Sequence, residues 1–370
     1  MAAGKSNAEY QRIHHFIADA PWDSLDLWKR LRMRIPEREG VVVIDDTGFH
    51  KQGSHSVGAA RQYCPPLGKV ANCQVAVTSI LRSARSTWPL AMDLYLPKEW
   101  AEDTDRREAA LVPSSIVARK KWELALRQIA RTKREGFSIR GVTADAGYGD
   151  TTEFRDGIGR LGLHYVVRIS GRQTVFKAQP RLVGEHWRPA PRPAKQFAAS
   201  LPDSAFKKVV WGKGSKGKLE IRVAACRVFL GTRRAPDEAI RESWLLIRRK
   251  RDGTQKLYLS NLPATATLLE LVQIAYSRWA VEQSYQQLKD DLGFDHFECR
   301  SWPAWNHHAV LSALAFTFLA IERRRSRRQK LPTIPAVRRV LSRLTLAMTV
   351  VEDPEMRELV ASFGRDPPTF

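Results

Sequence analysis

The chain has 370 residues, which is enough for one large domain with an insertion or for two ordinary domains. Its 43% hydrophobic and 27% charged residues are ordinary for a globular protein, so neither a disordered chain nor a membrane protein is the natural interpretation. The 61 Lys and Arg residues outnumber the 39 Asp and Glu residues, and the formal net charge of +22 favours a polyanionic partner, above all nucleic acid. Charge alone leaves open a basic structural protein of the nucleoid or ribosome.

Targeting and cysteine patterns exclude further classes. The longest strongly apolar run, residues 309–321, is too short to span a bilayer, and the N-terminus lacks the apolar stretch of a secretory signal. We therefore expect a cytoplasmic protein with no membrane partner. The four cysteines contain no Cys-x-x-Cys pair, which argues against a zinc knuckle or a disulfide framework and predicts ordinary reduced thiols.

The N-terminal part predicts short helices followed by strands. Residues 8–33 have apolar side chains at helical spacing around a break at residues 19–22. Residues 41–44 form a continuous apolar run, typical of a strand buried on both faces that then emerges into a loop at Asp45 and Asp46. Two further strands, residues 73–81 and 90–96, suit an antiparallel meander.

The next segment alternates between helix and strand. The pattern predicts a helix over residues 118–134, a strand over 139–144 that delivers Asp145 into a turn, a helix over 152–161 and a strand over 164–169. Three strands, helix, strand, helix, strand is the element order of the RNase H-like fold. We therefore predict an α/β protein, with a mixed sheet covered by helices on both faces.

The composition of the sequence changes after residue 170. Proline-rich and Gly-Lys-rich stretches alternate with strand-like runs up to about residue 259, which predicts a β-rich insertion. From residue 267 the pattern is helical again, and it ends in a basic stretch and a polar tail. The predicted organisation is a helical lead-in at 1–38, a core in two parts at 39–170 and 260–325, the insertion at 171–259 and a basic helical tail at 326–370.

Two aspartates are candidates for metal-dependent phosphodiester chemistry. Such chemistry needs several carboxylates at one point, to hold two divalent cations about 3.5 to 4 Å apart. Asp45 and Asp145 follow the first and fourth predicted strands, which are neighbours in an RNase H-like sheet. The alternative is that these residues and Asp46 are ordinary turn or cap residues.

A third acidic residue, Glu282, lies on a predicted helix over residues 275–289. At 100° per residue, Arg278, Glu282 and Lys289 fall on one face of this helix. An apolar stripe beside that face would pack the helix on the sheet; it consists of Ile274, Val281, Leu288 and Leu292. The alternative is a solvated ladder, in which Arg278 and Glu282 form a surface pair worth about 0.3 to 0.5 kcal/mol.

These motifs together resemble those of bacterial insertion-sequence DDE transposases. The closest group is the insertion-sequence-seven-hundred-one-like group, related to the insertion-sequence-four superfamily with its Tyr-x2-Arg-x3-Glu-x6-Lys signature. The resemblance covers roughly residues 10–320 and rests on five segments: Ile44 to Gly53, Ser56 to Cys64, Gly68 to Gln74, Ala144 to Gly149 and the helix from Arg278 to Lys289.

The resemblance implies roles for individual residues. Asp45, Asp145 and Glu282 match the catalytic, metal-binding acids, and they would hold two Mg²⁺ ions, with Mn²⁺ able to substitute. Asp45 is preferred to Asp46 because the family pattern is Asp-x-Thr-x-apolar. Arg278 and Lys289 match the DNA-contacting Arg and Lys of the signature. The tyrosine of the signature falls on Ala275, with Tyr276 one residue along, and Trp279 is either a base-stacking residue or part of the core.

The implied function is metal-dependent cleavage at transposon ends, followed by transfer of the 3′-hydroxyl into target DNA. The partners would be double-stranded DNA, as terminal inverted repeats and target, and a second copy of the chain on paired ends, in the bacterial nucleoid. Members of this group usually carry a further N-terminal DNA-binding segment, so the chain is expected to be truncated or mis-started. The alternatives are an RNase H-like nuclease without strand transfer and a noncatalytic, transposase-derived DNA-binding protein.

Overall fold

The structure is a computed structural model, and it describes residues 7–183, 186–214, 217–230, 241–250, 252–325, 333 and 335–340. A mixed five-stranded sheet is built around β1 (Glu39–His50). β3 (Lys69–Arg82) lies antiparallel on one side of β1, and β5 (Ser138–Thr143) lies parallel on the other. On its far side β3 pairs with both β2 (Ala60–Cys64) and β4 (Thr87–Leu94).

The sheet continues beyond β5 through a parallel bridge between Val142 and Tyr165, next to β6 (Val166–Ile169). The spatial order is therefore β4, β3, β1, β5 and β6. This confirms the predicted RNase H-like arrangement, in which the first and fourth strands of the series are neighbours.

The first strand is longer than the sequence predicted. The expectation that the chain leaves the strand at Asp45 is wrong, because β1 remains paired with β3 as far as His50, opposite Cys73. Asp45 lies in the middle of the strand, opposite Thr78. β5 ends at Thr143, which pairs with Val43, so Asp45 lies just beyond the point where β1 loses its parallel neighbour. The prediction also missed β2, which carries the polar residues Arg61 and Gln62 and lacks an apolar run.

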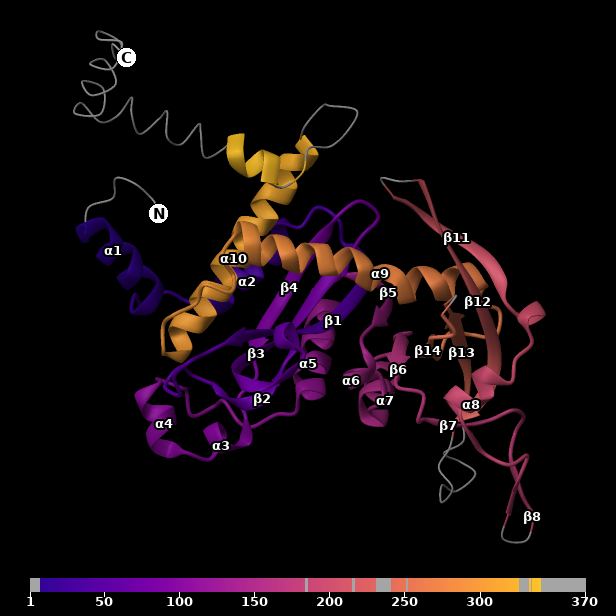
Figure 1. The fold of residues 1–370 in the computed structure, drawn as a ribbon. Helices are drawn as coiled ribbons and strands as arrows, with labels where there is room; N and C mark the ends of the chain where they lie inside the picture. Colours follow the sequence, from indigo (N-terminus) through magenta and orange to yellow (C-terminus); the bar gives the residue numbers. More distant parts are fainter. Residues whose placement is uncertain are drawn as a thin grey trace, which may run out of the picture.

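Helices cover both faces of this sheet, as predicted (Figure 1). Successive side chains of a strand point to opposite faces. Asp45 reaches Arg278 on α9 (Leu268–Gln286), whereas Asp46 reaches Lys121 on α5 (Lys121–Arg134), so these two helices lie on opposite faces. The start of α9 is fixed by a capping box, in which Thr267 Oγ1 accepts from Glu270 N at 3.2 Å and Glu270 Oε2 accepts from Thr267 N at 2.7 Å.

The residues between β6 and α9 are β-rich, as predicted, but their sheet is joined to the core. β14 (Gln255–Ser260) pairs antiparallel with β6, so β6 is an edge strand that the two sheets share. From β6 the order is β14, β13, β12, β7 and β10, and β11 also pairs with β12. The remaining strands are β7 (Thr174–Phe176), β8 (Arg181–Val183), β9 (His186–Arg188), β10 (Arg192–Pro193), β11 (Lys207–Gly214), β12 (Gly217–Leu230) and β13 (Arg241–Arg249).

The predicted N-terminal helices are α1 (Asn7–Ala18) and α2 (Ser24–Arg34), and they pack against the long helix α10 (Trp302–Arg325). In length and composition α10 could cross a membrane, and 61% of its most apolar window is buried within the protein. The basic tail predicted at 326–370 lies outside the described residues, except for residue 333 and the helical residues 335–340. The shorter helices are α3 (Lys98–Ala101), α4 (Thr104–Ala109), α6 (Ala146–Gly149), α7 (Thr152–Arg160) and α8 (Ala194–Ala199).

Candidate functional site

Asp45 is a largely buried carboxylate on the α9 face of the core sheet. Its side chain is 18% exposed, and its Oδ2 atom accepts from Arg278 Nη2 at 3.1 Å. Burial raises the pKa of Asp45 to about 6, and the charges of Asp145 and Asp46 add to this rise, although Arg278 opposes it. The protein therefore holds an anion here at a cost in solvation, which a bound cation would offset.

Asp145 lies beside Asp45 at the end of β5, at the start of a tight turn. It is the N-cap of α6, and its Oδ1 accepts from Gly147 N at 3.0 Å and from Tyr148 N at 3.4 Å. The turn presses against β6 at Gly149, where a Cβ atom would lie 1.9 Å from the carbonyl oxygen of Arg168. Only glycine fits there, so Gly149 sets the path of the turn that carries Asp145.

Asp46 lies on the opposite face of β1 and has a different environment. Its Oδ2 accepts from Lys121 Nζ at 2.9 Å, and its Oδ1 accepts from the hydroxyl of Tyr148. Burial raises the pKa of Tyr148 well above its usual value, and Asp46 adds to the rise, so this hydroxyl remains a donor. Asp46 thus ties β1 to α5 and to the Asp145 turn. The sequence left Asp45 and Asp46 as alternatives, and the structure gives them opposite faces.

Glu282 is exposed and lies one helical turn beyond Arg278 on α9. It has no hydrogen bond or ion pair to any other described residue. Burial alone would lower the pKa of Arg278, but the negative charges of Asp45, Asp145 and Glu282 raise it. Arg278 is therefore directed to Asp45, not to Glu282, and the alternative of a solvated Arg278–Glu282 surface pair does not hold.

These side chains fit a hard divalent cation by chemistry but do not yet form a closed site. Carboxylate oxygens are the ligands that Mg²⁺ prefers. Within the part of the chain that the structure describes, no three Asp, Glu, His or Cys side chains converge closely enough to hold an ion. Asp45 and Asp145 lie close enough for the charge of Asp145 to raise the pKa of Asp45, and Glu282 has an exposed side chain on the neighbouring helix.

Lys289 lies further along the same helix than Arg278 and Glu282, and it reaches Phe49, whereas Arg278 reaches Asp45. After Gln286 the helix widens into a π-helical turn, Gln287–Asp291, which changes the angular spacing of the residues that follow. Lys289 Nζ lies 5.9 Å from the ring centroid of Phe49. Phe49 is four residues beyond Asp45 on the same face of β1, which corresponds to about 13 Å along the strand. Burial lowers the pKa of Lys289.

Tyr276 and Trp279 belong to an aromatic cluster where α9 meets the insertion. The ring of Tyr276 lies 5.2 Å from Trp211 and 6.3 Å from Tyr258, and the guanidinium of Arg248 lies 5.6 Å from its centroid. Trp279 packs edge-on to Trp211 at 6.3 Å but is 55% exposed, so it is not a core residue.

The sequence did not identify several partners of the candidate residues. Lys121 and Thr78 lie in unremarkable helix and strand patterns. Only the strand register places Thr78 beside Asp45, and only the packing of α5 on the sheet places Lys121 beside Asp46. Tyr258 and Arg248 come from the insertion, where the sequence shows strands but not which of their residues face α9. The sequence shows Trp211 as an aromatic residue of the insertion, but it does not show which residues contact it.

The raised pKa of Asp45 predicts a pH-dependent effect of Asp45→Asn on stability. In the folded protein this pKa rises from 3.8 to about 6, so stability is lost as the pH rises through this interval, and Asn removes the loss. In EDTA, the variant should gain about 2 to 3 kcal/mol in unfolding free energy over the wild type between pH 3.5 and pH 7. Urea unfolding at both pH values measures this difference. A difference that does not change with pH would contradict the burial of an ionised Asp45.

The fold is that of an RNase H-like α/β protein, in which two aspartates lie together beside a helix that carries a third acid. A family model described as "DDE superfamily endonuclease" matches residues 1–218. The chain therefore belongs to the DDE superfamily endonucleases.

One named relative is similar to part of this chain. The protein named "Probable transposase for insertion sequence element IS701", from Microchaete diplosiphon, is 32% identical over 171 residues. That match covers 45% of this chain and 42% of the relative, so it spans less than half of either protein.

Among solved structures, a piggyBac transposase synaptic complex with hairpin DNA aligns over 99% of this chain and 66% of that chain, with 11% identity and a TM-score of 0.46. A Drosophila P element transposase strand transfer complex aligns over 43% of this chain and 40% of that chain, with 9% identity and a TM-score of 0.16.

Proposed function

We propose that the chain is the transposase of a bacterial insertion sequence, which cleaves DNA at the transposon ends and transfers the resulting 3′-hydroxyl into target DNA. The observation that carries the proposal is the juxtaposition of Asp45 and Asp145 beside Arg278, with Glu282 one turn along the same helix. The similarity to the IS701 protein supports it, and so does the net charge of +22, which suits a DNA substrate.

Asp45, Asp145 and Glu282 would hold two Mg²⁺ ions, for which Mn²⁺ would substitute. When bound, such ions activate a water or hydroxyl nucleophile and stabilise the leaving oxygen. Asp145 is oriented for this task by the amides of Gly147 and Tyr148. Glu282 would rotate toward the two aspartates and complete the ligand set.

Arg278 and Lys289 have separate roles in this proposal. Arg278 balances the charge of Asp45 when no metal is present, and its planar guanidinium would contact a phosphate near the scissile bond when the metals share that charge. Lys289 lies near Phe49 and would contact the DNA backbone further along the same face of the sheet. Tyr276 is packed among Trp211, Tyr258 and Arg248, and it would support the DNA-binding surface from below.

The proposed partners are double-stranded DNA, as terminal inverted repeats and target, and a second copy of the chain. Cutting and joining two ends needs two active sites, so we infer a homodimer on paired ends. The site of action would be the cytoplasm, at the bacterial nucleoid.

Strand transfer separates a transposase from an RNase H-like nuclease with the same acids. The test is to incubate the protein with Mg²⁺, a supercoiled target plasmid and a labelled duplex that already ends in the 3′-hydroxyl of the terminal repeat. The proposal expects label covalently joined to the plasmid. Nicked plasmid without joined label would instead identify a nuclease, and binding without either product would identify a noncatalytic DNA-binding protein.

The exposure of Trp279 predicts a binding effect without a folding effect. Trp279→Ala removes a surface ring, so the unfolding free energy should change by no more than about 0.5 kcal/mol. If the ring stacks on an unpaired base near the cleavage point, affinity for a terminal-repeat duplex with an unpaired base there should fall by about 1 to 3 kcal/mol. Fluorescence anisotropy measures the affinity for this duplex and for a fully paired duplex. An equal loss of affinity for the fully paired duplex would exclude base stacking.

A further inference from the structure

A cavity of about 780 Å³ lies on the face of the core sheet opposite to Asp45. Its position follows from Asp93, which lines it and accepts from Gln128 of α5 at 3.0 Å. Residues of α2, α5, β4 and the start of α10 line the cavity, and the site proposed above uses none of them. Its volume lies within the range of about 300 to 1,000 Å³ that is typical of sites for small molecules.

Different elements meet at the two ends of this cavity. At one end α2 meets the end of α5 and the middle of β4: Arg32 Nη2 donates to Glu135 Oε1 at 2.8 Å, and Arg32 Nη1 donates to the carbonyl oxygen of Leu90 at 3.1 Å. At the other end α10 begins beside the residues that precede α2, where His307 Nε2 lies 2.9 Å from the carbonyl oxygen of Trp22. Each wall can therefore be followed from one end of the cavity to the other.

The end at Arg32 is basic. Lys29 precedes Arg32 by about one turn of α2, and Arg127 and Arg131 precede the end of α5 by one and two turns. These three cations form no ion pair and no side-chain hydrogen bond with any other described residue. Glu135 is already paired with Arg32, so Asp93 is the single acid left to them in the lining.

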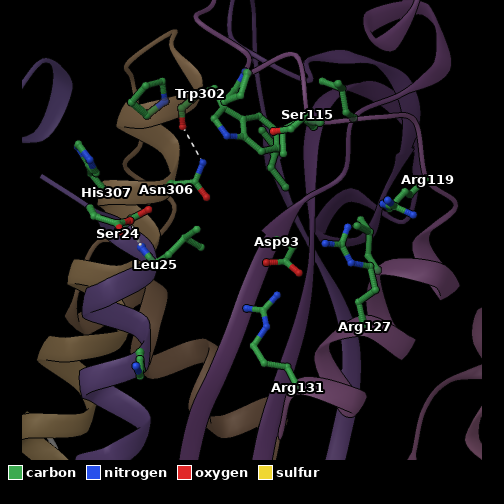
Figure 2. Close-up of a pocket in the computed structure, with 18 of the residues that line it drawn as sticks. Ser24, Leu25, Asp93, Ser115, Arg119, Arg127, Arg131, Trp302, Asn306 and His307 are labelled. Carbon is green, nitrogen blue, oxygen red and sulfur yellow. Dashed lines mark hydrogen bonds between the residues drawn. The ribbon is translucent and has the colours of Figure 1, made fainter. Parts of the chain in front are cut away.

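The opposite end is apolar. Figure 2 shows Trp302 toward the top of the view and Arg131 toward the bottom. One acid, Asp23, and one cation, Arg119, also line the upper part, and Asp23 accepts from Leu25 N at 2.7 Å. The excess positive charge of the lining therefore lies at the Arg32 end. The apolar side chains at the opposite end are Leu25, Leu96, Ile116, Leu124 and Trp302.

This separation of charge from apolar surface defines the chemistry of a ligand. Leu25 and Arg32 are seven residues apart on α2, and so are Leu124 and Arg131 on α5, which corresponds to about 10 Å along each helix. A fitting ligand has an anionic group at one end and an apolar body of about that length. A DNA backbone carries phosphates along its whole length, so it offers the apolar end nothing to pack against.

We propose that this cavity binds an elongated amphipathic anion, of the chemistry of a medium-chain fatty carboxylate. The carboxylate pairs with Lys29, Arg127 and Arg131, and the chain packs against Leu124 and Trp302. The bound ligand links α2 and α10 to α5, on the side of the sheet that the candidate catalytic acids leave free.

Isothermal titration calorimetry of the full chain with hexanoate, octanoate and decanoate tests the apolar end. The dissociation constant should fall about tenfold for each two methylenes added, because each buried methylene is removed from water. Octanol has the same chain as octanoate without the charge. It should bind at least about tenfold more weakly than octanoate, because it forms no charge-assisted hydrogen bond with the arginines.

Arg127→Gln/Arg131→Gln tests the basic end. This variant should raise the dissociation constant of decanoate at least about tenfold, because both charged hydrogen-bond donors are lost. Its urea unfolding should match that of the wild type, since neither arginine has an ion-pair partner among the described residues. The matched control is Arg134→Gln/Arg160→Gln, which removes two exposed charges outside the cavity and should leave decanoate binding unchanged.

Four results would overturn the proposal. Decanoate that binds neither protein nor variant would exclude such a site, and equal affinity for octanoate and octanol would reduce it to an apolar surface. Equal affinity of the wild type and Arg127→Gln/Arg131→Gln for decanoate would place the ligand elsewhere. Inorganic phosphate that binds as tightly as decanoate would make the cavity a site for simple anions. The affinity of the variant for duplex DNA should equal that of the wild type, which separates this test from that of the proposed function.

Discussion

Asp145→Asn and Glu282→Gln should each lower the rate of Mg²⁺-dependent DNA cleavage about a thousandfold, which corresponds to about 4 kcal/mol in the barrier. Each substitution removes a negative metal-binding oxygen and keeps nearly the same shape. Neither residue makes a contact that the fold needs from a charged carboxylate: Glu282 is exposed, and Asn at position 145 retains a cap oxygen for Gly147 and Tyr148. Affinity for the same duplex, measured in EDTA, should be undiminished.

The control for this pair is Glu153→Gln, which neutralises an exposed acid on α7 outside the site. Its cleavage rate should match that of the wild type. Metal affinity gives a second readout, because Mn²⁺ titration should show weaker binding in both site variants and unchanged binding in the control. Cleavage that survives in Asp145→Asn would place the metal site elsewhere.

Gly149→Ala should destabilise the protein by about 3 kcal/mol, because the new Cβ would lie 1.9 Å from the carbonyl oxygen of Arg168. Neither backbone segment can yield easily. The Asp145 turn is fixed by Tyr148 and Asp46, and β6 is held by β14 on its other side. Since the turn would have to move away from β6, cleavage should fall together with stability, as measured by urea unfolding and the cleavage assay.

Gly159→Ala provides the matched comparison for Gly149→Ala. Gly159 lies within α7, and nothing lies within 4 Å of its Cβ position. Because alanine is a better helix former than glycine, this variant should be more stable than the wild type by about 0.5 to 1 kcal/mol. If both variants behaved alike, the close approach of the Asp145 turn to β6 would not exist.

Much of the fold could be predicted because its strands and helices have strong periodic patterns. The run at residues 41–44 is buried on both faces, and α5 and α9 have clear apolar stripes, so these elements and their order were confirmed. The extension of β1 through Asp45 and Asp46 could not be predicted. Two adjacent acids are typical of a turn, and only pairing with the long strand β3 keeps them in a sheet.

The candidate site was predicted in part for a similar reason. Arg278 and Glu282 were placed on one helix by spacing alone, but the partner of Arg278 is Asp45, which lies far away in sequence. The π-helical turn that contains Lys289 could not be predicted, because such a turn leaves no clear signal in the residue pattern. The neighbours of Tyr276, which are Trp211, Arg248 and Tyr258, come from β11, β13 and β14, whose register against α9 depends on the assembled structure.

Cleavage of a transposon-end duplex by the wild-type protein tests the central claim most directly. The measurement uses a labelled duplex that carries the terminal repeat of the element, incubated with purified protein in Mg²⁺ or in EDTA. We predict a new 3′-hydroxyl at the boundary of the repeat in Mg²⁺ and intact DNA in EDTA. Intact DNA under both conditions, with the duplex demonstrably bound, would contradict the assignment of Asp45, Asp145 and Glu282 as a metal-dependent active site.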